Sequence, residues 1–400
     1  MTGIAYLIEA FAEGDLLRPR PEVRNLVDLS RSVAHLCGVE GIELSENAQG
    51  IVETIGDTDH IVLVLIDGMG MNLLERLPAD SFLRRHLWEQ AQTVFPSSTA
   101  VALTSLTTGE WPQDHAVTGW WTQLPALGSA ATILSYTARS NNQDLLKRGI
   151  MPETTFPVES LWKRMPRDAL VVVPKAIVGS VYSKYFSGGR ETIGYESLAG
   201  GVDSVVKHVC ESEGRTFSYL YSSRVDSEAH MYGMTRPEVQ HALSEVEREI
   251  KRLAGALKDK ARIVVTADHG FLDAPPPKRH TLRVNRQLQP FFRLMPSGDA
   301  RVMYLYTLEW ARERVRRYFE QRFDQVFMVV DTEDAIKIQL FGPTEPTDET
   351  RERLGDLVVV SSGADILEYN ASRGAGRMLQ LNGHHSGLTP DEMLIPLIIV

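Results

Sequence analysis

The sequence of 400 residues predicts an α/β fold of three layers, with helices on both faces of a mostly parallel central sheet. The runs at 61–66 and 263–265 are rich in Val and Ile and apolar at every position. Such runs are typical of central parallel strands that helices cover on both sides. Strand-like and helical segments also alternate along the chain, which indicates a layered α/β sheet.

The elements of this core follow one another up to residue 277. Residues 1–58 contain helical signals and polar loops, and a helix is expected over 71–77 after the first strand. The long amphipathic segment at 237–257 predicts a helix with one apolar face. Four strands are expected in this part of the chain, at 61–66, 169–173, 217–221 and 262–266.

Three consecutive prolines at 275–277 mark a boundary in the chain. Residues 278–380 are expected to form an inserted α+β cap with a basic helix over 308–323. The strand-like runs of this cap lie at 302–307, 327–330 and 357–360. The chain therefore divides into a catalytic core at 1–277, the cap at 278–380, and a return to the core at 381–400 that ends in a strand-like run at 393–400.

Charge and cysteine content exclude several classes of function. The chain has 42 basic and 52 acidic residues, a net charge of −10 and no basic stripe, which argues against a nucleic-acid polymer or an anionic membrane as partner. The apolar runs are too short to span a bilayer, and the N-terminus lacks the basic region of a signal peptide. Cys37 and Cys210 lie far apart, so no disulfide framework is expected. These features predict a cytoplasmic protein; they do not decide its oligomeric state.

The stretch at 94–109 reads as a turn, three consecutive hydroxyl residues, a short apolar helix and a glycine stop. Ser97, Ser98 and Thr99 are all favourable helix N-cap residues, and Pro96 stiffens the chain before them. Backbone N–H groups and the positive end of the helix dipole favour an anion at such a position. By itself the stretch is more typical of an ordinary capped helix, but its position also suits a nucleophile that attacks and then carries a phosphoryl group.

Three of the expected strands are followed by an aspartate, namely Asp67, Asp226 and Asp268. In open α/β sheets, ligands bind outside the carboxyl ends of the strands. The three carboxylates are therefore expected at one edge of the sheet. Taken one at a time, each is more typical of a turn or a helix cap, so the argument rests on the set.

Histidines follow two of these aspartates and recur near the end of the chain. His230 lies four residues after Asp226, so both can face one side of a helical turn, and His269 directly follows Asp268. A further pair lies at 384–385. Mixed carboxylate and imidazole ligands suit Zn²⁺ or Mn²⁺ better than Ca²⁺ or Mg²⁺. Three aspartates, two histidines and one member of the pair at 384–385 make six ligands, which divide into two sites of three, so we expect two divalent metal ions, with Zn²⁺ preferred and Mn²⁺ as the alternative.

Taken in order, these motifs resemble the type I phosphodiesterase / nucleotide pyrophosphatase branch of the alkaline phosphatase superfamily. The order of the whole set makes the resemblance specific, and the set covers most of the chain outside the cap. The matching segments are Leu-Ile-Asp-Gly at 65–68, Phe-Pro-Ser-Ser-Thr at 95–99 with Thr-Gly at 108–109, Trp-Pro-Gln-Asp-His at 111–115, Asp-Ser-Glu-Ala-His-Met-Tyr-Gly at 226–233, Thr-Ala-Asp-His-Gly at 266–270 and Gly-His-His-Ser-Gly at 383–387.

The resemblance implies an alkaline phosphatase-like fold with two metal ions, usually zinc. Within the family's spacing, Thr99 rather than Ser97 or Ser98 matches the nucleophile, and His384 falls at a position that the family lets vary. The implied ligands are Asp226, His230 and His385 for one ion, and Asp67, Asp268 and His269, together with Thr99, for the other.

The resemblance also implies an activity: hydrolysis of phosphodiester or nucleotide pyrophosphate bonds in a small phosphate ester or nucleotide, through a covalent phosphothreonine. A phosphomonoesterase or phosphonate hydrolase of the same superfamily is one alternative. A monoesterase needs extra cations, for which Lys175, Lys184 and Arg190 are available. A metal-dependent phosphotransferase or mutase is another alternative, although such relatives generally use serine and manganese. The complete ligand set argues against a binding protein without chemistry.

The sequence departs from the family pattern near the nucleophile. Val101 and Ala102 stand where proline and asparagine are common, and Trp120 stands where nucleotide pyrophosphatases have an asparagine that helps to hold the phosphate. We therefore expect the substrate's charge to be stabilised differently. The aromatic residues available to stack on a base or line an apolar leaving-group pocket, with core packing as the alternative, are Trp120, Trp121, Tyr182 and Tyr185.

Overall fold

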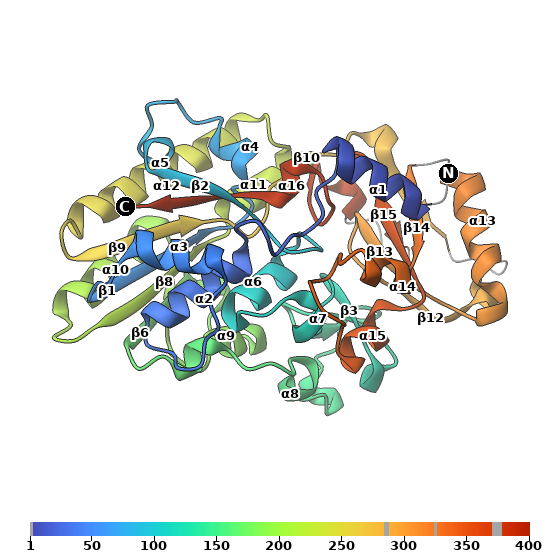
Figure 1. Ribbon diagram of the computed structural model, residues 1–400, viewed down its shortest axis with the longest axis horizontal. Coiled ribbons are helices and arrows are strands. Elements are labelled where there is room, and N and C mark those ends of the chain that lie inside the picture. Colours follow the sequence, from blue (N-terminus) through green and yellow to red (C-terminus); the bar gives the residue numbers. More distant parts are fainter. Residues whose placement is uncertain (1–2, 284–287, 324–325, 370–377) are drawn as a thin grey trace.

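A seven-stranded sheet forms the centre of the larger part of the molecule, and the computed structural model describes residues 3–283, 288–323, 326–369 and 378–400 (Figure 1). β1 lies in the middle of the sheet and pairs in parallel with β8 and β9, while β18 runs antiparallel to β9 and β2. The predicted mostly parallel sheet is confirmed. In spatial order, the strands are β2 (Leu87–Gln92), β18 (Leu394–Ile399), β9 (Ala261–Thr266), β1 (His60–Ile66), β8 (Thr216–Ser222), β6 (Asp168–Pro174) and β7 (Glu191–Tyr195).

Two groups of helices complete the three layers that the sequence predicts. Within the first group, helix α2 contacts α3 and α6, and within the second, α12 contacts α10 and α11. Residues 61–66 of β1 between these layers are all buried, which explains their continuous apolar run. The first group comprises α2 (Leu26–Leu36), α3 (Glu46–Ile55) and α6 (Thr99–Thr108), and the second α10 (Leu198–Glu211), α11 (Arg224–Tyr232) and α12 (Pro237–Ala256).

The helix expected over 71–77 is shorter than predicted. It is α4 (Met71–Leu74), and the next residues continue in tighter turns, with Leu77 N–H donating to the Leu74 carbonyl. Pro78 follows, and the proline ring disfavours the helical conformation for the residue before it. The remaining short helices of the core are α5 (Phe82–Arg85), α7 (Pro112–His115), α8 (Pro152–Thr155), α9 (Val181–Phe186) and α16 (Pro390–Met393).

A second seven-stranded sheet is antiparallel and forms the cap, on the right in Figure 1. Alternate residues of β13 point to opposite faces, where α1 (Gly3–Glu13) and α13 (Arg312–Phe323) contribute to two separate apolar clusters. Helices α14 (Thr332–Lys337) and α15 (Asp348–Leu354) complete the cap. The strands, in spatial order, are β14 (Phe327–Asp331), β15 (Leu357–Ser361), β13 (Val302–Thr307), β12 (Phe292–Gly298), β3 (Trp121–Leu124), β4 (Ser129–Thr132) and β5 (Thr137–Ala138).

The cap sheet takes segments from outside 278–380, because β3–β5 extend it and α1 covers one of its faces. The division of the chain into 1–277, 278–380 and 381–400 stays a prediction. Within the predicted cap, 284–287, 324–325 and 370–377 lie outside the described residues. Where the chain leaves and re-enters the core, β11 (Arg279–Leu282) pairs with β16 (Ile366–Tyr369) and β10 (Leu272–Asp273) with β17 (Gly383–His384).

No helix in the described part of the chain has the length and apolar character that crossing a bilayer requires. Cys37 is buried and Cys210 is exposed, and both are free thiols.

Candidate active site

The carboxyl ends of three neighbouring parallel strands create the site. β1 pairs in register with β8 and β9, so that Leu65 lies opposite both Tyr221 and Thr266. The chain segments that leave these strands therefore emerge side by side, and they carry the three aspartates identified in the sequence. The β10–β17 pair then places the loop after β9 next to the histidine pair at 384–385.

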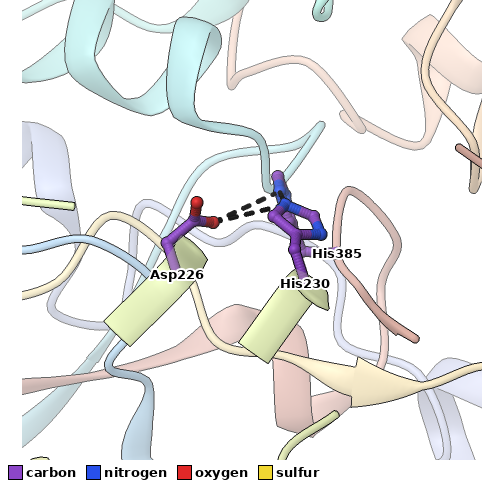
Figure 2. Close-up of side chains that lie close together, drawn as sticks. All are labelled: Asp226, His230 and His385. Atoms are coloured by element: carbon purple, nitrogen blue, oxygen red, sulfur yellow. Dashed lines mark hydrogen bonds and ion pairs between the residues drawn. The ribbon is translucent and has the colours of Figure 1, made fainter. Parts of the chain in front are cut away.

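The first cluster contains Asp226, His230 and His385, whose ligand-type atoms all lie within 4.8 Å of one another (Figure 2). Asp226 and His230 lie one turn apart on α11, and Asp226 Oδ1 is 3.3 Å from His230 Nε2. His385 Nε2 is 3.2 Å from His230 Nε2 and 3.9 Å from Asp226 Oδ1. The structure thus brings together the three residues that the resemblance assigns to one ion.

The second cluster contains Asp67, Asp226 and His269, again with ligand-type atoms within 4.8 Å of one another. His269 Nε2 lies 3.4 Å from Asp67 Oδ1 and 3.4 Å from Asp268 Oδ2. Asp268 uses its other oxygen, Oδ1, to accept hydrogen bonds from the N–H groups of Gly68 and His269. Asp226 therefore lies between the two clusters, and Asp268 approaches the second through Oδ2 alone.

The three histidines share an arrangement that fixes how each ring can bind a metal. Nδ1 of each ring hydrogen bonds to a backbone carbonyl: His230 to Gly383 at 2.8 Å, His269 to Gly270 at 3.0 Å and His385 to Ser97 at 2.9 Å. A carbonyl only accepts, so Nδ1 carries the proton in each ring and Nε2 presents its lone pair to the cluster. Metal-bound histidines are characteristically held in this way.

The carboxylates have the complementary property. Asp67 Oδ1, Asp226 Oδ1 and Asp268 Oδ2 are buried and accept no hydrogen bond from the residues that the structure describes. Burial, followed by the charges of the neighbouring carboxylates, raises the pKa of Asp67 well above its usual value, and burial also raises that of Asp226. Burial and the adjacent imidazoles lower the pKa of His385, which keeps this ring neutral. Buried acceptor oxygens beside neutral imidazoles fit divalent cations that prefer mixed nitrogen and oxygen ligands.

Of the three consecutive hydroxyl residues at the start of α6, Thr99 is the one whose side chain faces the second cluster. Its Oγ1 lies 3.2 Å from His269 Nε2, and the residue is 5% exposed. Ser98 is the N-cap residue of α6, and Ser97 Oγ donates to the Gly387 carbonyl beside the loop of His385. The first residue of the helix thus presents a hydroxyl where the helix dipole favours an anion.

Asp299 is a residue near the site that the sequence did not single out. It is buried in the turn between β12 and β13, and its Oδ2 accepts a 2.9 Å hydrogen bond from the Trp120 N–H. Burial raises the pKa of Asp299 to about 6. The backbone at the position of the family asparagine is therefore held by a carboxylate of the cap.

The same turn of the cap also contacts the core through an ion pair between Arg301 and Glu392. Arg301 Nε and Nη2 donate to Glu392 at 2.5 and 2.9 Å. Glu392 Oε1 also accepts a 2.7 Å bond from the Gly387 N–H, and Arg301 N–H bonds Ser386 Oγ. The cap is thereby tied to the loop that follows His385.

Other candidate residues have different roles in the structure. His384 is buried, its pKa falls to about 3 because of burial, and its Nε2 lies 3.3 Å from the Leu381 carbonyl rather than in either cluster. Lys175 pairs with Glu196 on the surface, Lys184 is exposed, and Arg190 donates to backbone carbonyls. None of these three cations belongs to the clusters described above.

Of the four aromatic residues that the sequence suggested for binding a base or an apolar leaving group, Trp121 and Tyr185 have partners within the fold. Trp121 stacks under the Arg139 guanidinium, 3.7 Å from its ring centre. Tyr185 stacks on Phe156 and donates to the Val158 carbonyl. Core packing therefore accounts for these two rings.

Comparison with known protein families finds one model that matches most of the chain. The family model described as type I phosphodiesterase / nucleotide pyrophosphatase matches residues 61–386. No curated protein sequence matches the chain significantly.

Solved structures share the fold at low sequence identity. Murine ectonucleotide pyrophosphatase / phosphodiesterase 5 superposes with a TM-score of 0.64 at 16% identity, covering 84% of this chain and 87% of that one. The human protein of the same name gives 0.63 at 15% identity, covering 85% and 87%. Phosphonoacetate hydrolase from Sinorhizobium meliloti, in complex with phosphonoacetate, gives 0.59 at 18% identity, covering 84% and 89%.

Proposed function

This chain belongs to the type I phosphodiesterase / nucleotide pyrophosphatase family of hydrolases, and we propose that it cleaves phosphodiester or nucleotide pyrophosphate bonds in small molecules through a phosphothreonine at Thr99. One observation carries the proposal: the Thr99 hydroxyl, on the first residue of α6, lies 3.2 Å from His269 Nε2 at the edge of a cluster of three carboxylates and three imidazoles. A nucleophile, an anion-binding helix end and ligands for cations thus meet at one point.

The proposed ligands follow from the two clusters. We propose two divalent ions, Zn²⁺ by ligand type with Mn²⁺ as the alternative. When bound, such a pair lowers the pKa of a hydroxyl and of water and offsets negative charge on the phosphate. The residues that would hold them are Asp226, His230 and His385 for one ion and Asp67, Asp268, His269 and Thr99 for the other, with Asp226 within reach of both.

The chain's own residues then perform the transfer. Thr99 Oγ loses its proton and forms a bond to phosphorus as the bond to the leaving oxygen breaks. The proton ends on the released alcohol, and a phosphothreonine that still carries the other ester group is left. Attack by water on that phosphorus breaks its bond to Oγ and restores the Thr99 hydroxyl. The N–H groups at the start of α6 favour the negative charge of the phosphate in both steps.

Two related activities remain as alternatives with distinct requirements. A phosphonate hydrolase is the first alternative; the chain shares the fold of phosphonoacetate hydrolase, and that likeness does not extend to the activity. A phosphomonoesterase needs extra cations, and Lys175 and Arg190 are engaged elsewhere. Threonine as nucleophile weighs against a serine-dependent phosphotransferase or mutase.

We further propose that the protein works in a reducing compartment such as the cytoplasm, which the free thiols of Cys37 and Cys210 support.

A comparison of substrates tests the proposal. The protein loaded with Zn²⁺ or Mn²⁺ is assayed on bis(p-nitrophenyl) phosphate, p-nitrophenyl phosphate, a dinucleoside pyrophosphate and phosphonoacetate. We expect kcat/KM for a diester or pyrophosphate to exceed that for the monoester and the phosphonate by orders of magnitude. A preference for the monoester or for phosphonoacetate would assign the chain to the corresponding alternative.

A further inference from the structure

A cavity of about 140 Å³ lies beside the candidate active site, between α6, α9 and the sheet. Three of its walls come from elements that carry the proposed machinery. Leu103 lies one helical turn after Thr99, and Ser223 is the N-cap residue of α11, which carries Asp226 and His230. Tyr221, also in the wall, donates its hydroxyl to Asp67 Oδ2. A group that enters this cavity therefore lies against the elements that carry Thr99 and Asp226 and against the tyrosine that bonds Asp67.

The lining of the cavity is uncharged. It consists of six aliphatic or phenylalanine side chains, three tyrosines and three serines, with no Lys, Arg, His, Asp or Glu among the described residues that line it. Burying a charged group there without a partner is unfavourable. Burying an apolar group there is favourable, because it removes apolar surface from water.

The size of the cavity indicates which apolar group fits. A dry cavity of roughly 150 Å³ lined by apolar side chains accepts one benzene ring. Ile177, which lines this cavity, is 37% exposed, so the cavity opens to solvent at that residue. One aromatic ring can therefore enter without rearrangement of the core.

One hydroxyl in the wall has no partner. Tyr219 is 1% exposed, and its Oη makes no hydrogen bond to the described residues. By contrast, Tyr182 Oη lies 3.0 Å from Thr104 Oγ1, and Ser183 Oγ donates to the Ile177 carbonyl. A buried hydroxyl normally finds a partner, so Tyr219 is available to a polar atom of a bound ring.

We propose that this cavity is the specificity site for one ester group of the substrate, and that it takes a single uncharged aromatic ring with one hydrogen-bonding atom facing Tyr219. The inference rests on the proposed function, because it names the substituent of the diester that Thr99 attacks. It excludes substituents with a carboxylate, and it disfavours nucleosides, whose several polar groups would meet an apolar wall.

The test uses diesters that share p-nitrophenolate as the leaving group and differ in the other ester group. The holoenzyme is assayed on phenyl, methyl, carboxymethyl and thymidine-5′ p-nitrophenyl phosphates. We expect kcat/KM for the phenyl ester to exceed that for the methyl ester about tenfold or more, and the carboxymethyl ester to be the poorest. Leu134→Trp, which fills the cavity from a half-buried turn position, should bring the phenyl-to-methyl ratio of kcat/KM close to one.

The hydroxyl is tested separately with a pyridyl ester. Tyr219→Phe should lower the pyridyl-to-phenyl ratio of kcat/KM about threefold to tenfold. Tyr304→Phe is the matched control, because the Tyr304 hydroxyl is equally buried and unpaired among described residues but lies in the cap core. It should leave this ratio unchanged.

The outcomes separate the inference from the function on which it rests. If no diester is hydrolysed, or turnover survives Thr99→Ala, the proposed function fails. If turnover requires Thr99 but the phenyl-to-methyl ratio is near one, the cavity inference alone is wrong. It is also wrong if the thymidine or carboxymethyl ester is the best substrate, or if Leu134→Trp leaves the phenyl-to-methyl ratio unchanged.

Discussion

Arg301 of the cap and Glu392 of the catalytic part form a two-point ion pair whose side chains are both fully buried. Glu392 also accepts a hydrogen bond from the Gly387 N–H. The Gly387 carbonyl in turn accepts a hydrogen bond from Ser97 Oγ. The cap is therefore attached to the loops that present His385 and Thr99.

Breaking this pair on one side should destabilise the protein. Arg301→Met leaves a buried, unpaired carboxylate, which we expect to lower the free energy of unfolding by about 3–5 kcal/mol. Urea denaturation measures the change. The double variant Arg301→Met/Glu392→Met removes both charges and should recover part of the loss. Equal stability of wild type and the single variant would show that the pair contributes nothing.

Asp28 predicts a dependence of stability on pH. Burial raises the pKa of this carboxyl, in α2 away from the site, from 3.8 to about 6. The folded state then binds this proton more tightly than the unfolded state, so the contribution of Asp28 to stability is greatest below pH 4 and is lost as the pH rises through 6. A rise from 3.8 to about 6 corresponds to about 3 kcal/mol.

Asp28→Asn tests this dependence, because an amide preserves the shape of the side chain without titrating. Urea denaturation at pH 5 and pH 8 should show a smaller loss of stability for the variant than for the wild type. Identical slopes for the two proteins would contradict the assignment to Asp28. Asp15→Asn, which makes the same substitution at an exposed aspartate, is the control for the effect of the substitution itself.

Metal stoichiometry should distinguish the two clusters. Asp226 belongs to both, so Asp226→Asn should lose both ions, whereas His385→Ala should lose one. His384→Ala is the matched neighbour outside both clusters and should retain two ions per chain. Elemental analysis after gel filtration gives these numbers. Full metal content in Asp226→Asn would rule out its position between the sites.

The parts of the site that the sequence predicted are those in which one segment carries its own signal. The apolar run of β1 and the aspartate after it needed no partner to be recognised, and the structure places Asp67, Asp226 and Asp268 at one edge as expected. The choice of His385 over His384 depended on family spacing, and the geometry agrees, because only His385 lies in a cluster.

The parts that the sequence did not predict depend on pairing between distant segments. Asp299 accepts a hydrogen bond from the Trp120 N–H, and Arg301 forms an ion pair with Glu392. No local pattern within the cap predicts which loops of the core the turn that carries Asp299 and Arg301 will contact. The joining of β3 to β12 is of the same kind, since it rests on one register pair between short strands far apart in sequence. Glu392 did carry a local signal: Thr389 and Glu392 form a capping box.

Activity should follow the Thr99 hydroxyl. Thr99→Ala should abolish turnover of bis(p-nitrophenyl) phosphate with metal content near normal, and Thr99→Ser should retain measurable turnover because it keeps a hydroxyl at the same position. Ser98→Ala, at the neighbouring N-cap residue, is the control: the Ser98 side chain makes no capping hydrogen bond to the helix, so this variant should retain turnover. Greater loss of activity from Ser98→Ala than from Thr99→Ala would move the nucleophile to Ser98.

The central claim is the covalent intermediate on Thr99, and mass spectrometry of the acid-quenched enzyme tests it most directly. The holoenzyme is mixed with bis(p-nitrophenyl) phosphate, quenched within milliseconds and digested. We predict a peptide containing Thr99 whose added mass corresponds to the transferred p-nitrophenyl phosphoryl group, absent from Thr99→Ala. Rapid turnover in the same quench series with no modified Thr99 peptide, or with the modification on another residue, would contradict the account.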